Sequence, residues 1–168
     1  MHTLARFGSC TAAIAVAISP AATFGIVNAA AEGGTRVALD AAERRCDFSK
    51  VTTAARVPRP LMGSGSAVIS TSGSKAVAQV HVTIPNEPGI HYDVGLIQEP
   101  RPSSATCGPG DPGTAFTGMD TDAAGNATVT VADGIRQGTT GVWVIVARAD
   151  PHSQDPAEFY TSEFVAPV

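Results

Sequence analysis

The stretch KAVAQVHVTIPNEPGIHYDVGLIQ, residues 75–98, decides the fold, because apolar and polar side chains alternate along both of its halves. An alternation with a period of two places successive side chains on opposite faces of a β-strand. The turn-forming residues NEPG, at 86–89, separate the two halves. The stretch therefore predicts two strands, 75–84 and 90–98, that form a hairpin.

The same alternation recurs along the rest of the chain, with Gly- and Pro-rich turns about every ten residues. Further strands are expected at 49–57, 65–71, 114–121, 126–131, 141–149 and 158–166. This spacing predicts an all-β fold, namely an antiparallel immunoglobulin-like β-sandwich of about seven to eight strands over residues 50–168. A small β-barrel is the alternative.

The beginning of the chain reads as an export signal. Arg6 precedes a long apolar run, and the small residues at 28–31 provide a cleavage preference. We therefore interpret residues 1–30 as a signal peptide, with a retained membrane anchor as the alternative. The protein is expected to be secreted or to stay in the cell envelope, and to meet the membrane only through this segment before cleavage.

Residues 31–49 form a leader to the domain. The piece TRVALDAAERR carries a thin apolar stripe at Val37, Leu39 and Ala42, which is typical of a short helix. The alternative is a loose arm held down by Cys46.

Cysteine usage predicts one disulfide. Of the three cysteines in the chain, Cys10 lies in the signal peptide, which leaves Cys46 and Cys107. Two cysteines in an exported protein pair more often than not. No C-x-x-C motif is present, and no His lies near either cysteine in the sequence, so a structural disulfide is favoured over a metal or redox pair.

Composition excludes some partners. An apolar content of 43% is too high for a disordered chain and is sufficient for a core. The net charge of −4 argues against nucleic acid and against anionic membranes. The expected partner is an unknown protein or an envelope ligand.

The segment MDTDAAGNATVTV, residues 119–131, resembles a calcium loop at first sight. An EF-hand loop that starts at Asp120 would need oxygen ligands at its fifth and twelfth positions. Those positions hold Ala124 and Val131. The segment therefore predicts a tight turn in which Asp122 bonds its own turn amides and Gly125 adopts a positive φ.

One group of titratable residues is a candidate metal site. If strands 75–84 and 90–98 pair around Glu87, then His81 faces Asp93 and His91 lies close by. Two imidazoles and a carboxylate form a plausible copper or zinc site or a pH-sensitive patch. The alternative is that these side chains belong to an ordinary solvated sheet face.

Enzyme motifs are weak. The sequence S-G-S-K, residues 72–75, matches the S-x-x-K pattern of penicillin-binding enzymes, which requires a helix start and a later K-T-G. Here it lies in a turn between strands, and no K-T-G follows. His152 lies in a loop without local partners. We therefore expect a non-enzymatic protein with no catalytic residue and no cofactor.

The strand VWVIV, residues 142–146, is apolar on both faces. A sheet with one buried face needs only one apolar side, so something must cover the other. Either the leader or a long loop packs there, or Trp143 and Ile145 form an interaction face. Tyr92 and Tyr160 are candidates for the rim of that face or for the core.

The stretches CDFSKV, HYDVGLIQEPRPSSATCGPGDPG, TDAAGNATVTV and PAEFYTSEF together resemble a group of small exported proteins of mycobacteria and their relatives. The resemblance spans the chain from Cys46 to its end. It implies export and a β-rich domain, and it transfers no catalytic or binding residue.

These observations together predict a secreted or envelope-associated, non-enzymatic binding module of unknown ligand. The alternative function is a metal or small-ligand carrier that uses His81, His91 and Asp93.

Overall fold

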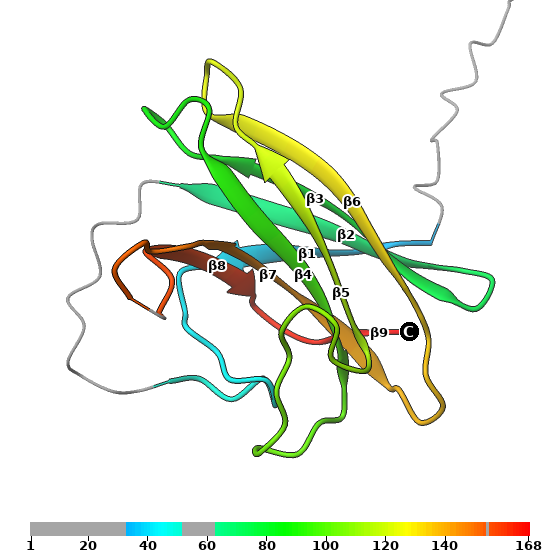
Figure 1. Cartoon of the computed structure of the whole chain (residues 1–168). Helices are drawn as coiled ribbons and strands as arrows, with labels where there is room; N and C mark the ends of the chain where they lie inside the picture. Colours follow the sequence, from blue (N-terminus) through cyan, green and yellow to red (C-terminus); the bar gives the residue numbers. More distant parts are fainter. Residues whose placement is uncertain (1–32, 52–62, 154) are drawn as a thin grey trace, which may run out of the picture. The chain divides into compact units, whose positions relative to one another are not determined.

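A computed structural model describes residues 33–51, 63–153 and 155–168, and the strands in these ranges form one antiparallel β-sheet (Figure 1). The strands are β1 (Thr35–Asp40), β2 (Ser64–Ser72), β3 (Lys75–Thr83), β4 (His91–Glu99), β5 (Thr114–Asp120), β6 (Asn126–Gly134), β7 (Gly141–Arg148), β8 (Glu158–Ser162) and β9 (Ala166–Pro167). The signal peptide predicted at 1–30 and most of the strand predicted at 49–57 lie outside the described residues. Among the described residues there is no helix, and hence none that is long and apolar enough to cross a membrane.

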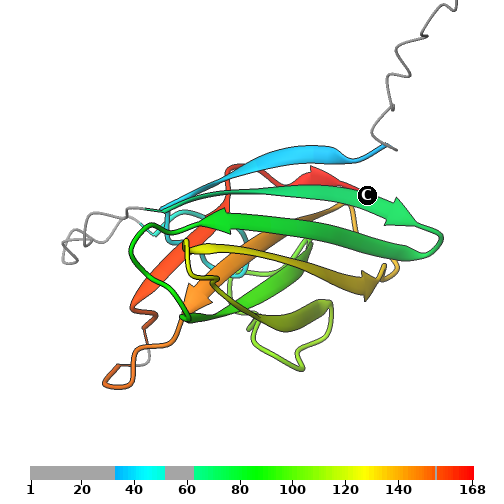
Figure 2. The same ribbon diagram turned by 90° about the horizontal axis from the view of Figure 1, so that it is seen from above.

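The sheet runs in the order β5-β4-β7-β8-β1-β2-β3-β6, and β9 adds to β7. The predicted all-β, antiparallel fold is confirmed. The predicted immunoglobulin-like sandwich is not confirmed, because β1 and β8 pair through Leu39–Ser162 and Asp40–Thr161 and join what would otherwise be two sheets. The sheet curls until its two end strands, β5 and β6, approach each other (Figure 2), so the small-barrel alternative fits.

The leader contains a strand where the sequence predicts a short helix or an arm. Residues Thr35–Asp40 pair with β2 along their length and with β8 at their end. Val37 and Leu39 are buried, whereas Arg36 and Ala38, which alternate with them, are exposed. This alternation has the period of a half-buried strand. Pairing with β2 and β8 holds the segment in the strand conformation.

The predicted hairpin between 75–84 and 90–98 is wrong. β3 pairs with β2 and β6, and β4 pairs with β5 and β7. The connection at residues 84–90 crosses from one side of the curled sheet to the other instead of turning within a ladder. The positions of the individual strands agree closely with the prediction; their neighbours do not.

The interior is filled by alternate side chains of every long strand, mostly valines and alanines. The fully buried or nearly buried members are Val37, Leu39, Ala67, Ile69, Ala76, Ala78, Val80, Val82, Tyr92, Val94, Leu96, Met119, Ala127, Val131, Val142, Val144, Val146 and Tyr160. Burial of apolar area is the main source of stability for such a core.

A polar cluster closes one end of the interior. The Tyr92 and Tyr160 hydroxyls both donate to the buried carboxylate of Glu158. Arg148 lies 3.4 Å from Glu158 and 3.0 Å from Glu87, and Glu87 also accepts from Tyr92 at 3.0 Å. These hydrogen bonds and ion pairs tie the 84–90 connection to β4, β7 and β8, although Arg148 Nε is buried without a hydrogen-bond partner among the described residues.

Gln98 closes the other end. It continues the inward-facing side of β4 and has almost no exposed surface. Its amide nitrogen donates to the Asp133 carboxylate at 2.6 Å and to the Gly134 carbonyl at 2.8 Å. Its amide oxygen accepts from the backbone N–H of Arg136 at 2.9 Å and from the Thr139 hydroxyl at 2.7 Å. Gln98 thus links β4 to the end of β6, although these strands do not pair.

Residues 41–51 cover Trp143 on the outer face of β7. The Phe48 ring packs on Trp143 at 5.6 Å, and Arg44 stacks over the Phe48 ring at 4.0 Å. Arg44 also donates to the Thr161 hydroxyl. The predicted disulfide joins Cys46 in this segment to Cys107 in the loop after β4, so the leader and a long loop together provide the cover.

Loss of the disulfide should weaken the fold without changing it. A Cys46→Ser/Cys107→Ser double variant should lose about 2–4 kcal/mol of unfolding free energy, because the bridge closes a loop of 61 residues in the unfolded chain. Urea unfolding followed by the fluorescence of Trp143, the only tryptophan, measures this. Wild type in a dithiol reductant is the matched control, and an unchanged midpoint in both samples would contradict the expectation.

Candidate functional site

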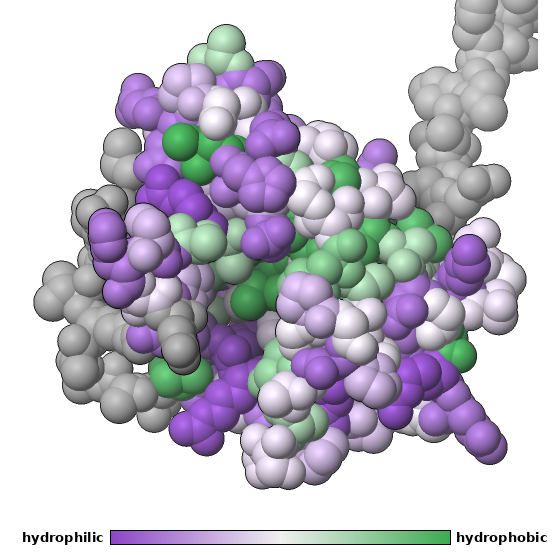
Figure 3. Space-filling view, in the orientation of Figure 1, coloured by the Kyte–Doolittle hydropathy of each residue, from purple (hydrophilic) through white to green (hydrophobic). Residues whose placement is uncertain are grey.

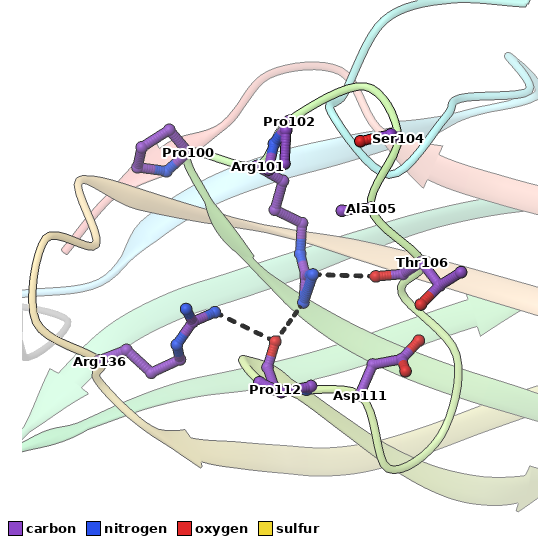
Figure 4. A pocket seen from close by; sticks show the side chains of 9 residues that line it. All are labelled: Pro100, Arg101, Pro102, Ser104, Ala105, Thr106, Asp111, Pro112 and Arg136. Carbon is purple, nitrogen blue, oxygen red and sulfur yellow. Dashed lines mark hydrogen bonds between the residues drawn. The ribbon is translucent and has the colours of Figure 1, made fainter.

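The loop between β4 and β5, residues 100–113, folds around the side chain of Arg101 (Figure 4). The two terminal nitrogens of its guanidinium donate to the Thr106 carbonyl at 3.0 Å and to the Pro112 carbonyl at 2.5 Å. Its Nε is buried without a hydrogen-bond partner among the described residues. The loop therefore orients the Arg101 guanidinium without neutralising its charge.

A second guanidinium reaches the same carbonyl oxygen. Arg136, in the loop after β6, donates to the Pro112 carbonyl at 3.1 Å. Its backbone is fixed by Gln98 and by a turn in which Thr139 N–H donates to the Arg136 carbonyl. Its side chain lies across Gly113, where an added Cβ would collide with the guanidinium. Glycine is thus needed at 113 both for this approach and for a φ of +73°.

The two arginines line an open pocket of about 370 Å³ together with Ser104, Thr106 and Asp111. The Asp111 carboxylate is engaged by the Gly108 N–H at 2.8 Å. Within the described ranges, neither Arg101 nor Arg136 forms an ion pair with a carboxylate. The pocket therefore holds two guanidinium groups and one carboxylate, a formal charge of about +1, on a chain whose net charge is −4.

Two guanidinium groups held side by side are suited to bind an anion. Each terminal nitrogen of an arginine carries two hydrogens, so those that contact carbonyls still have donors to spare. The Nε and Nη2 of Arg136 make no hydrogen bond to the described residues. A carboxylate or phosphate oxygen bound there would gain charge-assisted hydrogen bonds, which are stronger than neutral ones.

Trp143 does not form an exposed interaction face. It has no exposed surface, and its indole N–H donates to the buried Glu99 carboxylate at 2.9 Å. Burial raises the pKa of Glu99, although the Trp143 hydrogen bond opposes this effect. Ile145 remains half-buried beside Phe116, whose ring lies over Gly95. Of the two interpretations of this strand, a covered face and an exposed interaction face, Trp143 fits the first, because residues 41–51 cover it.

Tyr92 and Tyr160 are core residues and not rim contacts. Both are almost fully buried. Burial raises the pKa of each hydroxyl, and hydrogen bonds to Glu158 raise it further. The two phenols therefore act as neutral donors that hold Glu158 in place.

The candidate metal residues do not converge. His81 lies on β3 with its Nδ1 2.9 Å from the Thr128 hydroxyl, whereas His91 and Asp93 lie on β4, which is not a neighbour of β3. His91 instead sits between two carboxylates, with Nδ1 2.8 Å from Asp120 and Nε2 3.8 Å from Asp93. The described residues contain no group of three His, Cys, Asp or Glu side chains that could hold a metal ion. The pairing predicted for this site is wrong because it depended on the hairpin.

The turn predicted in 119–131 is confirmed. Asp122 Oδ1 accepts from the N–H groups of Ala124 and Asn126 at 2.8 and 2.9 Å, and Gly125 has a φ of +81°. The same hydrogen bonds lower the pKa of Asp122. Ser72 and Lys75 of the S-x-x-K match face each other at the end of the β2–β3 hairpin.

The arginine pair was missed from sequence. Arg101 and Arg136 are far apart in the chain, and no motif spacing links them. One signal was available for their support: Gln98 follows Tyr92, Val94 and Leu96 on the inward side of its strand, and a polar residue at a core position marks a buried network.

The chain matches no protein-family model, no curated protein and no solved structure.

The position of His91 predicts its titration. The hydrogen bond to Asp120 raises the pKa of His91, and the charge of Asp93 acts in the same direction. The pKa measured by NMR should therefore exceed about 6.5, the ordinary histidine value. An Asp120→Asn variant should lower it, because the larger contribution is lost. A pKa that does not change in this variant would contradict the geometry.

The buried Glu99 predicts a pH dependence of stability. Because the pKa of Glu99 is raised in the folded state, the free energy of unfolding decreases as the pH rises above the ordinary glutamate pKa of 4.5. Glu99→Gln keeps an acceptor for Trp143 and removes this loss. The difference in unfolding free energy between variant and wild type should shift in favour of the variant from pH 4 to pH 7. A difference that is constant with pH would show that Glu99 titrates normally.

Proposed function

We propose that this protein is an exported, non-enzymatic binding module that holds an anionic group of its ligand between Arg101 and Arg136. The observation that carries the proposal is the convergence of both guanidinium groups on the Pro112 carbonyl at an open pocket. Neither arginine has a carboxylate partner in the described part of the chain.

The disulfide supports export. Disulfides persist in oxidising surroundings such as the cell exterior and the envelope. Cys46–Cys107 joins the cover segment to the loop that holds Arg101, so the same bond that suits an extracellular protein also fixes the binding loop. The export signal expected at residues 1–30 agrees with this location.

Binding requires little rearrangement. Arg101 is fixed by two carbonyls of its own loop, and the backbone of Arg136 is fixed by Gln98. A ligand that meets pre-oriented donors loses less free energy on binding than one that must order them. The buried carboxylates Glu99 and Glu158 are each engaged with aromatic donors, which favours a structural role for them over a catalytic one.

The proposal predicts an anion effect that depends on Arg136. At an inorganic phosphate concentration of about 100 times Kd, the unfolding free energy should rise by about 2.7 kcal/mol. Arg136→Gln should lose most of this gain, because half of the cationic pair is removed. Thermal melts in low-salt buffer with added phosphate or acetate measure it.

The matched control is Arg45→Gln, which removes one exposed arginine outside the pocket. Phosphate also stabilises proteins without specific binding, so only the difference between the two variants counts. Equal stabilisation of the Arg136 and Arg45 variants by phosphate and by acetate would overturn the proposal.

A further inference from the structure

The two end strands of the sheet leave a row of backbone groups without a ladder. The sheet begins at β5 and ends at β6, and no ladder joins these two strands in the described chain. The Gln98 N–H donates to the Gly113 carbonyl, and the Thr121 N–H donates to the Ile90 carbonyl. The backbone N–H and C=O groups of the odd-numbered residues of β5 therefore point toward β4. The N–H and C=O groups of Phe116, Gly118 and Asp120 therefore face away from β4, toward β6.

The corresponding edge of β6 follows from the same reasoning. The Ile84 N–H donates to the Gly125 carbonyl, and the Ile135 N–H donates to the Ser74 carbonyl. The backbone N–H and C=O groups of the odd-numbered residues of β6 therefore point toward β3. The backbone groups of Thr128, Thr130 and Ala132 thus face β5. Figures 1 and 2 show β5 and β6 spreading apart from the turn that joins them. We call the boundary between these two strands, which no ladder closes, the seam.

The inward side chains beside the seam are less buried than those elsewhere in the interior. Ala115, Thr117 and Val129 point toward the interior but remain half-buried, whereas the inward residues of β3 and β4 are buried. Figure 3 shows apolar side chains gathered over the middle of β5 and β6. The seam therefore combines two partly exposed apolar residues, Ala115 and Val129, with backbone groups that no ladder pairs.

The arginine pair lies at one end of the seam. Pro112 precedes the first residue of β5 by two positions, and Arg136 follows the last residue of β6 by two positions. Their contact joins the two strands at the end opposite to the Asp122–Gly125 turn. A positive charge thus stands where β5 begins.

We propose that the ligand is the C-terminal end of an extended peptide, which adds to the free edge of β5 and places its terminal carboxylate at Arg136 and Arg101. This inference rests on the proposed function and names its ligand. A strand whose carboxyl end lies where β5 begins runs antiparallel to β5, which is the more stable pairing. Strand addition of this kind is a recurring way to bind peptides.

The free edge favours a peptide over another anion with an apolar body, such as a fatty acid. A hydrocarbon chain could cover Ala115 and Val129, but it cannot pair with the backbone groups of Phe116 and Gly118. A peptide backbone satisfies those groups and also supplies side chains to cover the same two apolar residues. β5 has seven residues, so a peptide of about six residues spans it.

The test uses arrays of random hexapeptides attached through their N-termini, in free-acid and C-terminal amide forms. Full-length processed protein, Arg136→Gln and Arg45→Gln are applied to both arrays. Wild type and the Arg45 variant should bind a subset of the free acids. The amides and the Arg136 variant should bind at least about tenfold more weakly, since the charge-assisted hydrogen bonds at the carboxylate are lost.

The best free-acid peptides are then made with N-methyl groups at alternate positions, in both registers. One of the two registers should abolish binding, because it blocks the N–H groups that pair with β5. Binding that survives methylation in both registers, or that is equal for acids and amides, would overturn the inference. Failure of every peptide and of palmitate alongside an Arg136-dependent phosphate effect would overturn it while leaving the proposed function intact. Arg136-dependent palmitate binding without peptide binding would assign the seam to a lipid instead.

Discussion

Backbone hydrogen bonding is the constraint on which this structure depends. Every N–H and C=O of a buried sheet needs a partner, and the ladders of this sheet supply them from β4 through β3. β5 and β6 each lack a ladder on one side, because the two strands meet at a turn and then separate. Side chains link the sheet across this boundary at one end: Gln98 reaches from β4 to the end of β6, and Arg136 reaches to the Pro112 carbonyl that precedes β5. The same contacts that complete the fold therefore assemble the candidate site.

The outer face of the sheet adds a second requirement, since β7 is apolar on both sides. A segment of 11 residues, 41–51, lies over Trp143 and is anchored by Arg44 and by the disulfide. The disulfide partner, Cys107, belongs to the loop that encloses Arg101. Covering an apolar face and orienting a cationic loop are thus one structural solution. This explains why an exposed loop rich in glycine and proline is well fixed by hydrogen bonds.

The strands could be predicted from sequence because their alternation is local, and seven of them lie close to where the pattern places them. Their neighbours could not, because pairing depends on how a connection such as 84–90 crosses the sheet. His81 and Asp93 were expected to face each other for that reason alone. β1 was misread because Val37, Leu39 and Ala42 fit a helical stripe as well as a strand. The disulfide was predictable from two cysteines and an export signal, whereas the arginine pair depends on tertiary closure that no spacing reveals.

Amide hydrogen exchange tests the central claim, that β5 and β6 meet without a ladder. If the seam is open, the amides of Phe116, Gly118, Thr128 and Thr130 exchange rapidly, while those of Thr117, Met119, Val129 and Val131 exchange slowly because they bond to β4 and β3. This alternation, residue by residue along both strands, is the result the account predicts. Equal protection of both sets in the free protein would mean that a ladder closes the sheet, and would contradict it.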